Sequence, residues 1–132
     1  VLYGLNPEKL NFVTWIQKEL GMGREVNIVT DQYASPTFVG NLSSMILALI
    51  KNQEKGVFHT AGEERINRYD FALKIADVFD LNKNLIRATN SSNMDWIAER
   101  PMDSSLDTIK ISKTIKPFNI EEGLKVMKEC LR

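Results

Sequence analysis

Apolar residues recur at intervals of three and four along several stretches of the chain, which is the spacing of an amphipathic helix. The strongest stretch predicts a helix that Asn41 caps and that ends before Gly56. Its expected buried face is Leu42, Met45, Ile46, Leu49 and Ile50. An earlier stretch predicts a helix over residues 12–20, for which Asn11 and Asn6 are rival caps and Gly21 is the stop.

The second half of the chain predicts three more helices. Asn67 and Asp70 resemble a capping box at the start of one of them, whose apolar face is Tyr69, Ala72, Leu73, Ala76 and Phe79. Asp107 suits the cap of a short helix that ends near Ile115. Asn119 caps the last helix, whose apolar residues are Ile120, Leu124, Met127 and Leu131.

Short apolar runs between the helices predict strands at Val1–Gly4, Val26–Val29, Val57–Ala61 and Leu85–Ile86. The expected fold class is therefore α/β, with helices packed on strands that are too few for a full doubly wound sheet. Val1–Gly4 reads as the end of a buried strand closed by a glycine turn. We expect the chain to be the C-terminal part of a longer protein.

Composition and charge narrow the function classes. The 132 residues include 17 basic and 17 acidic side chains, so no charge excess calls for a nucleic-acid or membrane partner. The longest apolar run, Met45–Ile50, is too short to span a bilayer. Cys130 is the single cysteine of the sequence, which excludes an internal disulfide framework and suits a reducing cytoplasm.

Local motifs for catalysis are missing from the sequence. His59 is the single histidine and follows Phe58 in an apolar run, which favours a structural, hydrogen-bonded role over a catalytic triad or a metal site. Gly21-Met22-Gly23 follows a helix and precedes a strand, the reverse of a dinucleotide-binding loop. No tyrosine is followed four residues later by lysine, so we assign no catalytic residue to this chain.

Polar segments at element ends are the candidates for binding. Asp31–Thr37 lies between a predicted strand and a predicted helix, where α/β proteins gather ligands, although it also suits an ordinary connection. Arg100, held by Pro101, suits bidentate capture of a phosphate or a surface ion pair with Glu99 or Asp103. Asn11 suits either a helix cap or an anionic ligand at the helix N-terminus.

The order of several motifs resembles the C-terminal half of the extended short-chain dehydrogenases/reductases, and most of all the dTDP-4-dehydrorhamnose reductase family. The resemblance covers nearly the whole chain. The pieces that carry it are Val1–Gly4, Asn11-Phe12-Val13, Asp31-Gln32, Pro36-Thr37, Asn41-Leu42-Ser43, Gly56–Gly62, Arg100-Pro101, Ser105-Leu106-Asp107 and Lys110.

This resemblance implies a substrate-binding domain over residues 5–132, with residues 1–4 as the last trace of a Rossmann domain. NADPH or NADH would be bound mainly by that missing N-terminal domain, which would also carry the catalytic Tyr and Lys. The ligand implied for this part is a dTDP-sugar whose 4-keto group is reduced, and a homodimer is left open. Carried over by position, the substrate-binding residues are Asn11, Gln32, Pro36, Thr37 and Arg100.

A second reading comes from the same superfamily. The regulatory β subunit of methionine adenosyltransferase keeps this fold and a similar Asp-Gln…Pro-Thr loop, but it acts as a binding partner. The upstream sequence separates the two readings, because an intact Tyr-x-x-x-Lys favours a reductase and its loss favours a regulatory subunit.

Overall fold

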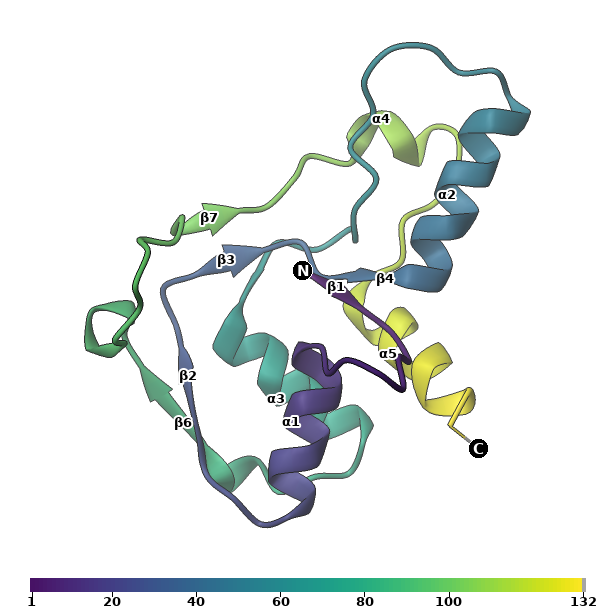
Figure 1. Ribbon diagram of the computed structural model, residues 1–132. Coiled ribbons are helices and arrows are strands. Elements are labelled where there is room, and N and C mark those ends of the chain that lie inside the picture. Colours follow the sequence, from purple (N-terminus) through teal and green to yellow (C-terminus); the bar gives the residue numbers. More distant parts are fainter. Residues whose placement is uncertain (132) are drawn as a thin grey trace.

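The computed structural model describes residues 1–131, along which short strands alternate with helices (Figure 1). This confirms the α/β class that the sequence predicts. None of the helices in this range combines the length and apolar character needed to cross a bilayer. In chain order the elements are β1 (Leu2–Tyr3), α1 (Phe12–Gly21), β2 (Val26–Val29), β3 (Tyr33–Ala34), β4 (Thr37–Phe38), α2 (Val39–Lys51), β5 (Ile66–Asn67), α3 (Arg68–Val78), β6 (Ile86–Thr89), β7 (Asp103–Ser104), α4 (Ile109–Ser112) and α5 (Ile120–Glu129).

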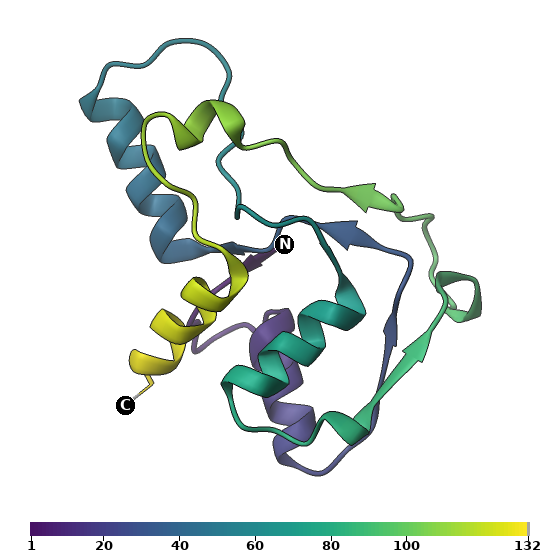
Figure 2. The same cartoon turned by 180° about the vertical axis from the view of Figure 1, so that it is seen from behind.

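The main core lies where α1 and α3 pack against each other and against the parallel pair β2–β6 (Figures 1 and 2). Helix α1 buries Val13, Ile16 and Leu20, which recur at three and four. In β2 the exposed Asn27 stands between buried neighbours, as expected for a strand with one covered face. The predicted strand at Leu85–Ile86 begins at Ile86 and continues to Thr89.

Tyr3 connects this core to α5. Its ring centroid lies 5.8 Å from that of Phe38 and 5.7 Å from that of Phe71. A Cβ at Gly123 of α5 would lie 2.1 Å from the Tyr3 hydroxyl, so glycine is what allows the helix to approach. Burial raises the pKa of Tyr3, and the charge of Glu64 adds to the rise.

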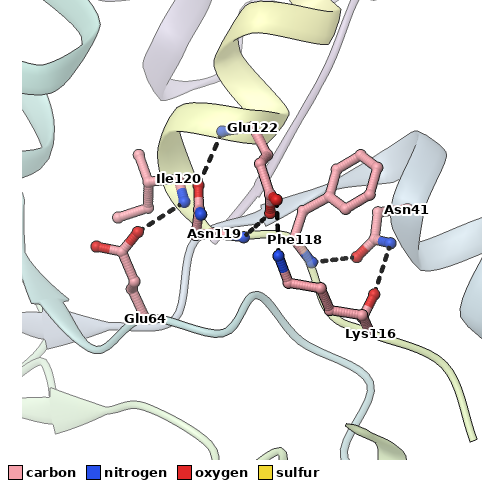
Figure 3. Close-up of polar contacts among 7 residues, drawn as sticks. All are labelled: Asn41, Glu64, Lys116, Phe118, Asn119, Ile120 and Glu122. Carbon is pink, nitrogen blue, oxygen red and sulfur yellow. Dashed lines mark hydrogen bonds and ion pairs between the residues drawn. The ribbon is translucent and has the colours of Figure 1, made fainter.

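Helix α2 begins at Val39, so the prediction that Asn41 caps it is wrong. Phe38 occupies the cap position without a side-chain hydrogen bond. The buried Asn41 amide instead fixes the segment before α5: Nδ2 donates to the carbonyl oxygen of Lys116 at 3.4 Å, and Oδ1 accepts from the backbone N–H of Phe118 at 2.9 Å (Figure 3). The Asn41 side chain therefore bonds to a segment far away in the sequence, although its local sequence predicts a bond to the start of its own helix.

The predicted apolar face of α2 is only partly buried. Met45 is fully buried, whereas Ile46 and Ile50 are 45% and 68% exposed. The other elements in residues 1–131 cover α2 along the side that carries Asn41 and Met45. The apolar periodicity thus predicts the helix and its apolar residues, but it does not predict how many of those residues the rest of residues 1–131 buries.

Side chains fix the N-terminus of α5, close to Asn41 (Figure 3). Asn119 and Glu122 form a complete capping box, which confirms the predicted cap. Glu64 accepts from the backbone N–H of Ile120 at 2.9 Å, and Lys116 donates to Glu122 at 2.7 Å. The helix then buries Ile120, Leu124 and Met127 of its predicted apolar face, but it ends at Glu129, before the predicted Leu131, which is 55% exposed.

Other element predictions are corrected by the structure. Residues 57–61 form no strand, because no neighbouring strand pairs with them, and Val57 is 78% exposed. The short helix α4 ends at Ser112 rather than near Ile115. Helix α3 starts at the predicted cap, but Asp70 accepts from the Asn67 side chain instead of its backbone. Its fully buried residues are Phe71, Ala72, Ile75 and Ala76.

Candidate anion-binding site

A small sheet of order β5-β3-β7 brings three distant segments together. Tyr33 of β3 pairs with Asn67 of antiparallel β5 and with Asp103 of parallel β7. Gln32, directly before β3, and Arg68, directly after β5, are therefore neighbours as well. The backbone N–H of Arg68 donates to the carbonyl oxygen of Gln32 at 3.1 Å. The sheet places the ends of three segments, far apart in sequence, around one hollow.

That hollow has a volume of about 290 Å³ and is called the arginine pocket below. It lies along β3, the central strand of the small sheet, and its cationic lining comes from the segments next to β5 and β7. Its lining residues are Gln32, Tyr33, Ala34, Arg68, Arg100, Pro101 and Ser104.

Gln32 carries an unusual group in the pocket. Its side chain is 4% exposed, and its Nε2 is buried without a hydrogen-bond partner among residues 1–131. A buried donor left without an acceptor costs about 1–3 kcal/mol, so such groups are rare unless a ligand or water uses them. Gln32 therefore offers a donor that the fold itself does not use.

Arg68 is the first residue of α3 and stands half-buried in the pocket wall. Its guanidinium carbon lies 5.5 Å from the ring centroid of Phe12. Burial lowers the pKa of Arg68, and the nearby charge of Arg100 lowers it further. The two arginines are thus close enough for their positive charges to oppose each other.

Arg100 reaches the pocket from the loop before β7, where its guanidinium carbon lies 4.7 Å from the ring centroid of Trp96. Within residues 1–131, ion pairs occupy Arg65 and Arg87 but neither Arg68 nor Arg100. The predicted pair of Arg100 with Glu99 or Asp103 is therefore not formed. Two cations that repel each other and lack a carboxylate favour an anion between them.

The rim of the pocket is held by a separate ion pair. Arg65 donates to Asp103 at 2.8 Å, and its guanidinium carbon lies 3.8 Å from the ring centroid of Tyr33. Hydrogen bonds from Ser105, together with Arg65, lower the pKa of Asp103 to about 2. Ser104 donates to the carbonyl oxygen of Tyr33 at 3.2 Å, which fastens β7 to β3.

The other residues predicted from the Asp31–Thr37 loop lie outside the pocket lining. Asp31 accepts from the backbone N–H and the hydroxyl of Ser91, and these bonds lower its pKa. Thr37 is buried, donates to the carbonyl oxygen of Ser35 at 3.0 Å and accepts from the backbone N–H of Gly62 at 3.0 Å. Pro36 is buried at a neighbouring hollow with Phe12. Of the predicted residues Gln32, Pro36 and Thr37, only Gln32 lines the pocket together with Arg100.

Asn11 caps α1 with both ends of its amide. Oδ1 accepts from the backbone N–H groups of Val13 and Thr14, and Nδ2 donates to the carbonyl oxygen of Gly4 at 2.6 Å. This decides between Asn6 and Asn11 as the cap, and Asn6 instead closes a turn with Glu8. Asn11 does not line the arginine pocket, but its neighbour Phe12 lies beneath the Arg68 guanidinium.

A larger hollow of about 650 Å³ lies between α3 and α5, and each lysine of its lining forms an ion pair. These pairs are Lys74–Glu64, Lys125–Glu121 and Lys128–Asp80. Exposed pairs of this kind are typical of a solvated helix surface. The arginine pocket is smaller, yet within residues 1–131 its two arginines form no ion pair and its Gln32 amide donor has no acceptor.

The donors that line the arginine pocket suit the binding of an anion. Its lining offers guanidinium and amide donors but no acid, base or nucleophile positioned beside another. His59 lies elsewhere, exposed, with Nδ1 3.2 Å from the carbonyl oxygen of Asp107. Gly23, at φ 71°, follows the end of α1 and leads into β2, so Gly21–Gly23 does not fit the phosphates of a dinucleotide cofactor.

The fold defines a substrate-binding part of the extended short-chain dehydrogenase/reductase class. Solved structures support this class across the whole chain. A dTDP-4-dehydrorhamnose reductase from Bacillus anthracis, solved in complex with NADP, matches with a TM-score of 0.87 and 26% identity, over 97% of this chain and 45% of that one. The chain belongs to the RmlD substrate binding domain family, whose model matches residues 1–132.

Curated relatives extend the comparison. A probable low-salt glycan biosynthesis reductase from Haloferax volcanii is 30% identical over 108 residues, covering 82% of this chain and 36% of that protein. The methionine adenosyltransferase 2 subunit beta of Rattus norvegicus is 30% identical over 119 residues, covering 84% of this chain and 35% of that protein. The chain thus spans about a third of the length of these curated relatives.

Arg68 is the residue that sequence reasoning missed. It lies between Asn67 and Asp70 of the predicted capping box and is not among the predicted binding residues. The sequence does contain a signal for Arg68. A cation in the first turn of a helix interacts unfavourably with the helix dipole, so its presence there suggests a role other than helix stabilisation. Its place beside Gln32 follows from the β3–β5 pairing, which the sequence did not predict.

Proposed function

We propose that this chain is the sugar-nucleotide-binding part of a dTDP-4-dehydrorhamnose reductase, which reduces the 4-keto group of dTDP-4-dehydro-L-rhamnose with NADPH or NADH. The observation that carries the proposal is the arginine pocket, whose lining includes both Gln32 and Arg100. Two unpaired arginines and a free amide donor suit the diphosphate of a nucleotide sugar. Membership of the RmlD substrate binding domain family supports the same ligand.

The division of labour in the whole protein is part of the proposal. Residues 5–132 bind the substrate, residues 1–4 end a strand of a cofactor domain, and that domain supplies hydride and proton transfer. In support, Gly21–Gly23 does not suit a cofactor loop, and the similar reductase of B. anthracis binds NADP. In this proposal the ligand does not contact Asn11, Pro36 or Thr37. These residues hold the helix and the loop that shape the pocket.

The test is turnover by the full-length protein. NADPH oxidation with dTDP-4-dehydro-L-rhamnose is followed by absorbance for the native protein and for Arg100→Met. Arg87→Met is the matched control, because Arg87 pairs with Glu25 at 2.6 Å on β6 and does not line the pocket. We expect turnover by the native and control proteins and a raised KM for Arg100→Met. Absence of turnover by the native protein would overturn the proposal.

The likeness to the methionine adenosyltransferase β subunit favours one alternative, a regulatory subunit without reductase activity. That reading predicts co-purification with a methionine adenosyltransferase catalytic subunit and no NADPH oxidation. An upstream Tyr-x-x-x-Lys in the same gene supports the reductase, and its absence supports the regulatory subunit.

A further inference from the structure

Three cation or donor groups of the arginine pocket have no counter-group within residues 1–131. They are the guanidinium groups of Arg68 and Arg100 and the buried Nε2 of Gln32. Every other arginine in this range forms an ion pair. The surplus is therefore specific to this hollow and is not a general property of the surface.

The fold fixes two of these groups before any ligand arrives. Gln32 is buried, and its carbonyl oxygen is tied to the first residue of α3 by the 3.1 Å bond from the Arg68 backbone. The Arg68 side chain is half-buried over the Phe12 ring, whereas Arg100 is exposed on its loop. A half-buried cation and a buried amide donor therefore share one hollow with a second, more accessible cation.

We propose that Arg68 is a specificity-determining residue that, with Arg100 and Gln32, selects a ligand carrying a diphosphate over one carrying a monophosphate. A diphosphate has two phosphoryl groups, one for each guanidinium, and enough oxygens to accept from the Gln32 amide as well. A monophosphate satisfies one arginine and leaves the other unpaired. This inference rests on the proposed function for the nucleotide sugar, but it assigns the role to a residue that the resemblance does not mark.

The experiment compares three ligands by titration calorimetry with the full-length protein: dTDP, dTMP and inorganic pyrophosphate. In Arg68→Met we expect the Kd for dTDP and for pyrophosphate to rise by about 10- to 100-fold, the scale of one charge-assisted hydrogen bond. The Kd for dTMP should change by less than about threefold, since Arg100 alone can hold one phosphate. Arg87→Met should leave all three constants unchanged.

The pyrophosphate arm separates this inference from the proposed function. If the native protein binds pyrophosphate through Arg68 but shows no reductase turnover, the inference stands and the proposed function fails. If the native protein turns over its substrate and Arg68→Met keeps the native ratio of dTDP to dTMP affinity, the inference is overturned alone. If the native protein binds neither dTDP nor pyrophosphate, both are overturned. A circular dichroism spectrum and melting temperature of Arg68→Met confirm that the variant folds.

Discussion

Replacing Gln32 with leucine should stabilise the unliganded protein and weaken its affinity for dTDP. Leucine has a similar volume and no amide, so the variant removes a buried donor that has no acceptor. Such a donor costs about 1–3 kcal/mol, and an imperfect fit of the new side chain costs up to about 1.5 kcal/mol. We therefore expect Gln32→Leu to raise the free energy of unfolding by about 1 kcal/mol without ligand.

When dTDP is bound, the native protein should be more stable than Gln32→Leu. At a dTDP concentration of about 100 times the native Kd, binding stabilises the native protein by about 2.7 kcal/mol. A tenfold weaker Kd in Gln32→Leu reduces this gain to about 1.4 kcal/mol. Calorimetric melting of the full-length protein, with and without dTDP, measures both effects in one series.

Asn41→Leu is the matched control, because Asn41 is also a buried amide but both of its ends are hydrogen-bonded. It should lower the melting temperature and leave the shift caused by dTDP unchanged. A lower unliganded melting temperature for Gln32→Leu would refute the reasoning, since the amide would then have an internal partner. An unchanged dTDP shift would remove Gln32 from the site.

Four further outcomes are expected. Arg100→Ala in the full-length protein should weaken dTDP-sugar binding by about 1.5–3 kcal/mol, and an unchanged Kd by calorimetry would exclude that contact. Gly123→Ala should lower the melting temperature because its Cβ would meet the Tyr3 hydroxyl at 2.1 Å, whereas Gly21→Ala, with open space around it, should not. Asp103 has its pKa lowered to about 2 from 3.8, so its stabilising effect is complete above the ordinary value and is lost as the pH falls between the two. Asp103→Asn should therefore flatten the dependence of the melting temperature on pH in that range, which a pH series of melts checks. The isolated chain should oxidise no NADPH with the keto sugar above a no-protein control.

Local signals were sufficient where both partners of an interaction are close in sequence. The capping box of Asn119 needs Glu122, three residues on, and the cap of Asn11 needs the next turn of its own helix. Asn41 has the same local appearance, yet its partner Phe118 is 77 residues away. A polar residue before an apolar run therefore predicts a cap only when nothing distant competes for its amide.

The loop Asp31–Thr37 shows the same limit within one segment. The sequence predicts a ligand-binding role for all seven residues, but only Gln32, Tyr33 and Ala34 of them line the arginine pocket. Gln32 faces the arginine pocket, whereas Thr37 faces inward and holds Gly62. The lining residues of this loop lie in β3 or directly before it, and the pairing of β3 with β5 and β7 has no signal in the sequence.

The pocket itself could not be predicted because it depends on three strands of only two residues each. Such strands have almost no sequence signature, and each is stable only because its neighbours are held elsewhere. Helix α3 holds β5, the bond from Leu106 to Ser35 holds β7, and β3 continues the loop from the core strand β2. The register of this sheet sets the distance between Arg68 and Arg100, so a change that shifts β7 would alter ligand selection without touching either arginine.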